Sequence, residues 1–267
     1  MCPVIPVQHP FLDGPFPRAY AHRGWHVGEL AGMENSLAAF RRAVAEGYHY
    51  LETDVHATRD GVVVVMHDAT LDRTTDRSGD IKRLDWRAVR NARVNGREPV
   101  CRLVDLLEEL PDARINIDVK ADSAVGPVFD LLHRTNAWHR VCLASFAEWR
   151  VRWLRKAAGS RLLTSMASAS VAALRLRSLC PVPPITAPII GELAQLPVRW
   201  CGIPVIDRAL LRYAHRRGWE VHVWTVNRAT DMQILLDLGV DGLVTDRPDV
   251  LRDVLRGRLL WPGGRPW

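Results

Sequence analysis

Short apolar segments rich in β-branched and aromatic residues alternate with amphipathic segments along the whole chain of 267 residues. Eight segments have strand character: RAYAH (18–22), YHYLETDV (48–55), RINIDVK (114–120), RVCLASF (140–146), RLLTSM (161–166), WCGIP (200–204), EVHVWTV (220–226) and DGLVT (241–245). Repeated strand–helix units favour a parallel sheet covered by helices. Eight such units predict an α/β protein with a TIM-type (β/α)₈ barrel.

The amphipathic segments between these strands carry helix signals. ENSLAAFRRAVAEG (34–47) has apolar residues at helical spacing and ends at Gly47, and LVDLLEEL (103–110) ends before Pro111. No linker-like stretch interrupts the alternation. We therefore expect one domain over 1–267, with its motif-bearing core at about 18–250.

One apolar segment does not fit the strand–helix alternation. VVVVMHD (62–68) follows the second strand after only a short RDG turn, so we expect it to form a hairpin with that strand. The polar, turn-rich residues 68–100 would then form a small cap above the barrel. The proline-rich region 175–197 reads as a loop with a short helix, and the tail 256–267 as loosely docked or frayed.

Composition excludes several classes of protein. No apolar run approaches the roughly 20 residues that span a bilayer, and the N-terminus lacks a signal-peptide pattern, so we expect neither stable membrane insertion nor secretion. The five scattered cysteines form no CxxC pair, which favours reduced thiols and a cytoplasmic location. The net charge of +6 comes from arginines spread over helical segments, which argues against nucleic acid as a partner. The sequence does not specify an oligomeric state.

Three acidic residues lie where two neighbouring strands end. Alternate strand residues share a face, so Glu52 and Asp54 project together, as do Asp118 and Lys120. Active sites of (β/α)₈ barrels lie at this end of the strands. Three converging carboxylates would repel one another unless a cation lay between them. Because all three ligands are oxygen donors, we expect one divalent cation, Mg²⁺ or Ca²⁺.

Two histidines follow strands at the same end of the barrel. His22 and Arg23 close the first strand, and His67 closes the hairpin strand. Imidazoles have pKa values near neutrality and suit a general acid and a general base. Arg23 and Lys120 would stabilise the negative charge that develops on a phosphoryl oxygen. These residues predict a phosphate ester as the substrate.

These fragments together resemble a known family. AHRG, MENSLAAFRRAVAEG, LETDVHATRDGVVVVMHD, LDRTTDRSG, INIDVK, WTVN and DGLVTDRP occur in the order typical of glycerophosphodiester phosphodiesterases. The resemblance spans residues 18 to about 250. It implies a phospholipase C-like (β/α)₈ barrel that uses a divalent metal to hydrolyse small glycerophosphodiesters to an alcohol and sn-glycerol 3-phosphate.

The resemblance also implies roles for individual residues. They are His22 and His67 as acid and base, Arg23 as catalytic phosphate contact, Glu52, Asp54 and Asp118 as metal ligands, Lys120 as phosphate contact and Trp224 as a pocket residue. The family usually has Glu where this chain has Asp118, which is one methylene shorter. Asp and Lys at this motif are also found in the related sphingomyelinase D-like barrel lipases.

Three functions remain open from the sequence. The first is hydrolysis of glycerophosphodiesters, the second a phospholipase D-like reaction on lysophospholipids or sphingolipids, and the third a non-catalytic barrel that binds phosphoesters. The remaining histidines are interpreted as structural. Glu34 and Asn35 are interpreted as caps of the first helix, and DRPD (246–249) as a turn that closes the eighth strand.

Overall fold

The computed structural model describes residues 7–180 and 188–262, and its centre is a ring of parallel strands. Neighbours in the ring follow the order β8-β7-β6-β2-β1-β13-β12-β9, with every pairing parallel. The strands are β1 (Arg18–His22), β2 (Tyr50–Ala57), β6 (Arg114–Val119), β7 (Val141–Ala144), β8 (Leu163–Thr164), β9 (Leu193–Pro197), β12 (Glu220–Trp224) and β13 (Gly242–Thr245).

The ring closes between β8 and β9 through few backbone contacts. Ser165 and Leu193 form a parallel bridge, and the Met166 amide donates to the Leu193 carbonyl at 2.8 Å. Gly191 adopts a φ of +110° there, and a Cβ atom on it would lie 2.8 Å from the Ser165 carbonyl oxygen. Glycine is therefore required for this approach. The barrel is nearly closed, as the strand alternation predicts.

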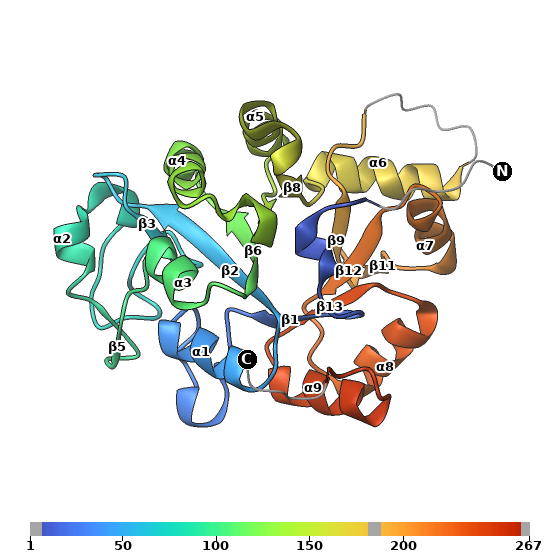
Figure 1. The fold of residues 1–267 in the computed structure, drawn as a ribbon, viewed down its shortest axis with the longest axis horizontal. Coiled ribbons are helices and arrows are strands. Elements are labelled where there is room, and N and C mark those ends of the chain that lie inside the picture. The colour runs from blue at the N-terminus through green and yellow to red at the C-terminus, as the bar shows by residue number, and fades with distance from the viewer. Residues whose placement is uncertain (1–6, 181–187, 263–267) are drawn as a thin grey trace.

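Helices surround the strands, as Figure 1 shows. They are α1 (Leu37–Ala45), α3 (Leu103–Glu109), α4 (Val125–Thr135), α5 (Glu148–Ala158), α6 (Ser168–Leu179), α7 (Arg208–His215), α8 (Ala229–Leu238) and α9 (Pro248–Gly257). Short 3-10 helices are η1 (Pro10–Asp13), η2 (Gly28–Leu30), η3 (Ile81–Arg83), η4 (Asp122–Ala124), η5 (Ala137–Arg140) and η6 (Gly159–Arg161). None of the helices in these described ranges combines the length and apolarity needed to cross a membrane.

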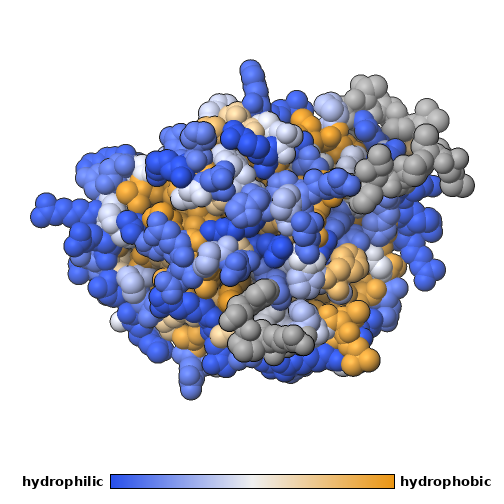
Figure 2. Space-filling model, viewed as in Figure 1, coloured by the Kyte–Doolittle hydropathy of each residue, from blue (hydrophilic) through white to orange (hydrophobic). Residues whose placement is uncertain are grey.

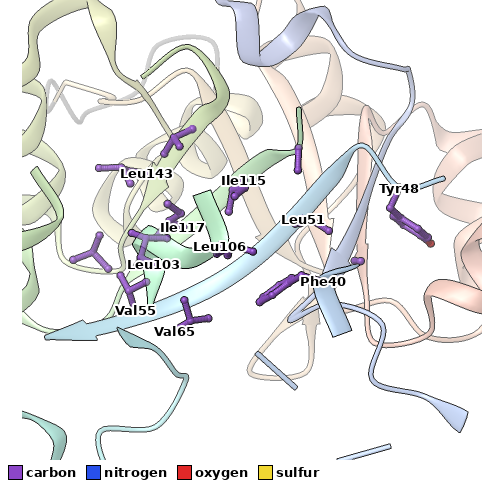
Figure 3. Close-up of a cluster of buried hydrophobic side chains, with 14 of the residues drawn as sticks. Phe40, Tyr48, Leu51, Val55, Val65, Leu103, Leu106, Ile115, Ile117 and Leu143 are labelled. Atoms are coloured by element: carbon purple, nitrogen blue, oxygen red, sulfur yellow. The ribbon is translucent and has the colours of Figure 1, made fainter. Parts of the chain in front are cut away.

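Side chains on the two faces of β2 have different surroundings. Leu51 and Val55 point outward and belong to one buried cluster with Ile115 and Ile117 of β6, Phe40 of α1 and Leu103 of α3 (Figure 3). The other face points into the barrel. Its lower part is filled by a buried cluster to which several strands contribute: Phe11, Tyr20, Tyr50, Cys142, Leu163, Leu193 and Val244. The polar residues of the strands therefore lie above a packed floor.

The hairpin and cap expected after the second strand are present. β3 (Val63–Val65) pairs antiparallel with β2, which confirms the hairpin. Beyond it lie α2 (Trp86–Val89), β4 (Arg93–Val94) and β5 (Glu98–Pro99), which project at one side in Figure 1. This cap segment (68–100) has a small apolar cluster of its own, built on Leu71, Ile81, Val89 and Val94 with Val64 and Met66 from the hairpin.

The prediction that residues 200–204 form a strand of the barrel is wrong. The strand that occupies this place in the barrel is β9 (Leu193–Pro197). It lies within residues 175–197, for which the sequence predicts a loop with a short helix. Residues 181–187 of that region lie outside the described ranges. The β9 sequence LAQLP contains no β-branched or aromatic residue, so it lacks a strand signal. WCGIP instead contributes to the exposed two-stranded hairpin of β10 (Arg199–Trp200) and β11 (Ile203–Pro204).

The C-terminal part docks more firmly than predicted. Trp261 packs edge-on against Tyr48, with ring centroids 4.9 Å apart. Residues 263–267 lie outside the described ranges.

Candidate active site

A cavity of about 710 Å³ opens at the C-terminal ends of the barrel strands. All residues predicted for the site line it: His22, Arg23, Glu52, Asp54, His67, Asp118, Lys120 and Trp224. The seven of these other than Trp224 are here called the charged wall. The structure therefore brings together side chains that are up to 202 positions apart in the sequence.

The chain turns sharply where β1 ends. Arg23 has a φ of +57°, unusual for a residue with a side chain, and the conformation is held by two backbone hydrogen bonds. The Arg23 amide donates to the Glu52 carbonyl, and the Asn35 amide donates to the Arg23 carbonyl, both at 2.9 Å. A Cβ atom on Gly24 would lie 2.8 Å from the Ala39 backbone, so only glycine fits after Arg23. The HRG sequence thus aims Arg23 at the carboxylates.

The carboxylates of β2 and β6 meet around one ammonium group. Asp54 and Asp118 are register partners on these adjacent strands. Lys120 Nζ lies 2.8 Å from Asp54 Oδ1 and 2.8 Å from Asp118 Oδ2. Arg23 Nε lies 3.1 Å from Asp54 Oδ2, although its direction is not that of a hydrogen bond. These two cations hold the pKa of Asp54 below its ordinary value despite burial.

Two carboxylate oxygens of the charged wall have no hydrogen-bond partner. Glu52 Oε2 and Asp118 Oδ1 are buried and accept no hydrogen bond. Burial, together with the neighbouring charge of Asp54, raises the pKa of Glu52 to about 8, and burial also raises the pKa of Asp118. Unpaired oxygens and raised pKa values indicate missing positive charge.

This donor set fits a hard divalent cation, although it is not gathered into a finished site. Glu52, Asp54 and Asp118 offer only oxygen atoms, as Mg²⁺ and Ca²⁺ prefer. Within residues 7–180 and 188–262, no three acidic, histidine or cysteine side chains are already arranged as a metal site. Lys120 occupies one oxygen each of Asp54 and Asp118, which leaves Asp118 Oδ1 and Glu52 Oε2 for an ion.

Each of the two histidines is oriented by an aspartate. His22 Nδ1 donates to Asp246 Oδ1 at 2.5 Å, and His67 Nδ1 donates to Asp68 Oδ1 at 2.6 Å. His22 Nε2 lies 3.6 Å from Glu52 Oε2. Burial lowers the pKa of His22, but Glu52 and the hydrogen bond to Asp246 outweigh it, so the pKa is raised. Both imidazoles thus have one nitrogen fixed and line the cavity, the arrangement that proton transfer requires.

The cap segment reaches the charged wall through one arginine. Arg73 donates from Nε to Asp68 at 2.6 Å and from Nη2 to Glu34 at 2.7 Å. Asp68 orients His67, and Glu34 accepts from Arg23 Nη1 at 2.9 Å. Arg73 therefore connects Asp68, which orients His67, with Glu34, which binds Arg23.

The interpretation of Glu34 and Asn35 as helix caps is wrong. Ser36 caps α1, because its hydroxyl accepts from the Ala39 amide. Asn35 Nδ2 instead donates to Asp54 at 3.3 Å, while its Oδ1 accepts from Thr53. Both residues support the charged wall. The short distance between Asn35 and the helix start makes the two roles indistinguishable in sequence.

The sequence predicts only a turn at residues 246–249 and does not reveal that Asp246 accepts from His22. The position of Asp246 directly after β13 could have indicated a role in the site, because acidic residues near the ends of other strands, such as Asp118, were predicted on that ground. Asn227 supports Asp246 from the end of β12, donating to its Oδ2 at 3.1 Å. Gln195 of β9 also lines the cavity, and it was missed because its strand was misplaced.

The rest of the cavity lining is largely hydrophobic. Six residues, here called the apolar wall, come mainly from α6 and from the segment around the β10–β11 hairpin: Phe146, Met166, Val171, Leu176, Trp200 and Val205. Trp224 joins them through an edge-on contact with Phe146, whose ring centroid lies 6.0 Å away. A ligand with both a charged and an apolar part would fit this division.

Comparison with known proteins identifies the family of this chain. Residues 22–250 match the glycerophosphoryl diester phosphodiesterase family. A probable glycerophosphodiester phosphodiesterase 2 of Mycobacterium tuberculosis is 42% identical over 92% of this chain and 93% of its own length. Human lysophospholipase D GDPD1 is 28% identical, covering 88% of this chain and 85% of its own length.

Solved structures share the fold. A putative glycerophosphoryl diester phosphodiesterase from Silicibacter pomeroyi has a TM-score of 0.78 at 23% identity, covering 96% of this chain and 100% of its own. An Oleispira antarctica phosphodiesterase in complex with sn-glycerol-3-phosphate has a TM-score of 0.72 at 20% identity, covering 90% and 97%. The chain therefore belongs to the glycerophosphoryl diester phosphodiesterase family and is an enzyme of that class, a phosphoric diester hydrolase.

Proposed function

We propose that this enzyme hydrolyses glycerophosphodiesters to an alcohol and sn-glycerol 3-phosphate, with His22 and His67 as general acid and base. The observation that carries the proposal is the pair of aspartate-oriented histidines in one cavity with Arg23 and Lys120. One imidazole would deprotonate the attacking hydroxyl and the other would protonate the leaving alcohol. Attack by water gives glycerol 3-phosphate directly, whereas attack by the glycerol 2-hydroxyl gives a cyclic phosphate that water must then open.

The cationic side chains have a separate role in this proposal. Arg23 lies at the cavity with its guanidinium fixed by Glu34, so it can donate to phosphate oxygens without reorganising. Lys120 adds a second positive charge from the end of β6. Both interactions strengthen as negative charge develops on the phosphoryl group, which lowers the barrier.

We also propose that Glu52, Asp54 and Asp118 hold one divalent cation, Mg²⁺ or Ca²⁺. Members of the family generally depend on such a metal, and the unpaired oxygens of Glu52 and Asp118 support its binding here. A bound divalent cation supplies Lewis-acid polarisation of the phosphoryl oxygens. The reach of Asp118, which replaces the longer Glu, decides whether it binds directly or through water.

The test measures glycerol 3-phosphate released from glycerophosphocholine by a coupled dehydrogenase assay. We expect activity to disappear in chelator and return with Mg²⁺ or Ca²⁺, and His22→Ala and His67→Ala each to lower kcat by about 10²–10⁴-fold. The control is His139→Ala, an exposed histidine of η5. Full activity in both site variants would reject the acid–base assignment.

The roles of the two histidines can then be separated with a p-nitrophenyl diester. This leaving group needs no protonation, so the variant that lacks the general acid should regain activity on it. The variant that lacks the general base should not. Equal losses on both substrates in both variants would contradict the division of roles.

The apolar wall supports a second candidate, a phospholipase D-like reaction on lysophospholipids or related lipids. Val171 and Leu176 of α6 line the same cavity as Lys120, so an acyl chain could lie along α6 while the phosphate meets the charged wall. Lysophospholipase D activity is named for the human relative. Comparing kcat/KM for lysophosphatidylcholine and glycerophosphocholine separates the two: a preference for the deacylated diester favours the first function.

Finally, we propose a cytoplasmic location. This proposal rests on the five scattered cysteines, which form no CxxC pair. Cell fractionation with an antibody to the native protein tests it, and recovery in the secreted fraction would overturn it.

A further inference from the structure

The β10–β11 hairpin exposes two large apolar side chains beside the cavity. Trp200 is 62% exposed and Ile203 is 68% exposed. The hairpin leaves the barrel directly after β9, at the end where the cavity opens, and Trp200 lines that cavity. In Figure 2, hydrophilic residues cover most of one face of the molecule and hydrophobic residues show only in separate patches. Two exposed apolar residues side by side on one hairpin indicate an interaction surface.

The hairpin is built to keep these side chains exposed. Cys201 and Gly202 form its two-residue turn with φ values of +47° and +80°, the positive values that a type I′ turn requires. Arg199 Nη1 donates to the Gly202 carbonyl at 2.8 Å, and the Val205 amide donates to the Val198 carbonyl at 3.1 Å. The apolar pair therefore projects from an ordered element.

The charge around the hairpin has one sign. Arg199 lies on the hairpin, Arg208 begins α7 just beyond it, and Asp207 is the single acidic residue within residues 198–208. Asp207 is already engaged, because it accepts from Arg175 at 2.6 Å and caps α7. Arg199 on the hairpin and Arg208 just beyond it are exposed. The surface is therefore complementary to negative charge.

We propose that the β10–β11 hairpin docks the enzyme onto an anionic lipid surface. Trp200 and Ile203 enter the region of the lipid headgroups, where an amphipathic indole and a short apolar side chain are favoured. Arg199 and Arg208 contact the phosphates. Docking through this hairpin turns the cavity toward the lipid. It does not depend on which diester the enzyme hydrolyses.

A second copy of the chain suits this surface less well. A two-fold interface would place the same patch on both copies, so the exposed Arg199 and Arg208 of each would face those of the other. Asp207 could not balance them, since it is paired within its own chain. Lipid phosphates supply the missing negative charge.

The test measures co-sedimentation of the full-length enzyme with vesicles, without substrate. The vesicles are either phosphatidylcholine alone or phosphatidylcholine with phosphatidylglycerol. We expect binding to the anionic vesicles, weakened by salt, and an apparent affinity lower by about tenfold in Ile203→Asp. The matched control is Ile234→Asp on α8, because Ile234 is 64% exposed on a different element. Arg208→Glu should weaken binding by severalfold.

Three results would overturn the proposal. One is equal binding of the wild type to neutral and anionic vesicles, and another is an equal loss in Ile203→Asp and Ile234→Asp. The third is a dimer in light scattering that Ile203→Asp dissociates while vesicle binding is absent. Turnover of soluble glycerophosphocholine by Ile203→Asp should stay at the wild-type level, which shows that the site is intact. Failure of that turnover in the wild type would bear on the proposed reaction alone.

Discussion

The charged wall and the apolar wall of the cavity are built in different ways. Residues of the charged wall lie within β2 or at the ends of β1, β3 and β6, and most of them are fixed by a second polar residue, as Asp246 fixes His22. The apolar wall comes mainly from α6 and the hairpin region, and two of its members, Leu176 and Trp200, are 45% and 62% exposed. The first wall is preorganised, and the second is partly open to solvent.

This difference suggests that the charged wall carries out the reaction and that the apolar wall determines substrate specificity. Charge stabilisation and proton transfer require side chains held at fixed positions, because small displacements cost much of the rate. Contact with an acyl chain of a substrate requires mainly apolar area. Substitutions in the charged wall and its supports should therefore lower kcat on every substrate, whereas substitutions in the apolar wall should affect some substrates only.

Among the residues that support the charged wall, the largest effect is expected for Asp246→Asn. Asp246 accepts from His22 Nδ1, and an amide in its place no longer stabilises the imidazolium or selects its tautomer. We expect kcat to fall by about 10²-fold or more on all diesters, with little change in KM. The measurement is steady-state kinetics on glycerophosphocholine. Asp249→Asn is the control, because Asp249 pairs with Arg247 on the surface; an equal loss there would remove the special role of Asp246.

A smaller and selective effect is expected for Leu176→Asp in the apolar wall. A carboxylate there should repel an acyl chain, because burying an unpaired charge is costly. We expect kcat/KM for lysophosphatidylcholine below its micellar concentration to fall by about tenfold. Glycerophosphocholine turnover should not change. Leu179→Asp is the matched control on α6, since Leu179 is 61% exposed and does not line the cavity. A loss on both substrates would show that the two walls do not act separately.

The same division explains how much the sequence could predict. Each residue of the charged wall lies at or just beyond a strand with a clear β signal, so alternation along the strand placed Glu52 and Asp54 correctly at the cavity. The apolar wall depends on β9 and the hairpin. LAQLP has no β-branched residue, so β9 was missed, and WCGIP has the residues of a strand although it forms an exposed hairpin. Tertiary closure of the barrel, and not local propensity, decides that strand.

The residues that support the charged wall could not be predicted from local sequence patterns either. Glu34, Asn35 and Asp246 contact residues up to 224 positions away, so their partners become visible only in the folded chain. A sequence containing Asn35 before a helix is consistent with a cap, and only the geometry distinguishes a cap from a bond to Asp54.

Arg73→Gln tests whether the cap segment belongs to the charged wall. Loss of the guanidinium frees Asp68 and Glu34, which orient His67 and Arg23. We expect kcat to fall by about tenfold, with a shifted pH profile and partial recovery in Arg73→Lys. Arg83→Gln in the same segment, with a side chain 81% exposed, should have no effect. Unchanged kinetics in Arg73→Gln would confine the charged wall to the barrel.

The smallest effect is expected in the stability of the metal-free enzyme. Burial and the nearby Asp54 raise the pKa of Glu52 from 4.5 to about 8, so between these values the folded protein binds one more proton than the unfolded chain. Stability therefore falls as the pH rises through this window and levels off above it. In chelator, we expect the Tm of the wild type to fall by several degrees between about pH 6 and pH 8.5, and less in Glu52→Gln.

Divalent cation should remove most of this slope. Its binding requires ionised carboxylates and stabilises the folded state, so the Tm gain on adding Mg²⁺ or Ca²⁺ should grow with pH in the wild type. Glu52→Gln should lose that gain, whereas Glu109→Gln, a surface glutamate paired with Arg41, should keep it. Identical slopes for wild type and Glu52→Gln would mean that Glu52 is ionised without metal. Arg23 and Lys120 alone would then neutralise the carboxylates of the charged wall, and the site would need no metal ion to balance its negative charge.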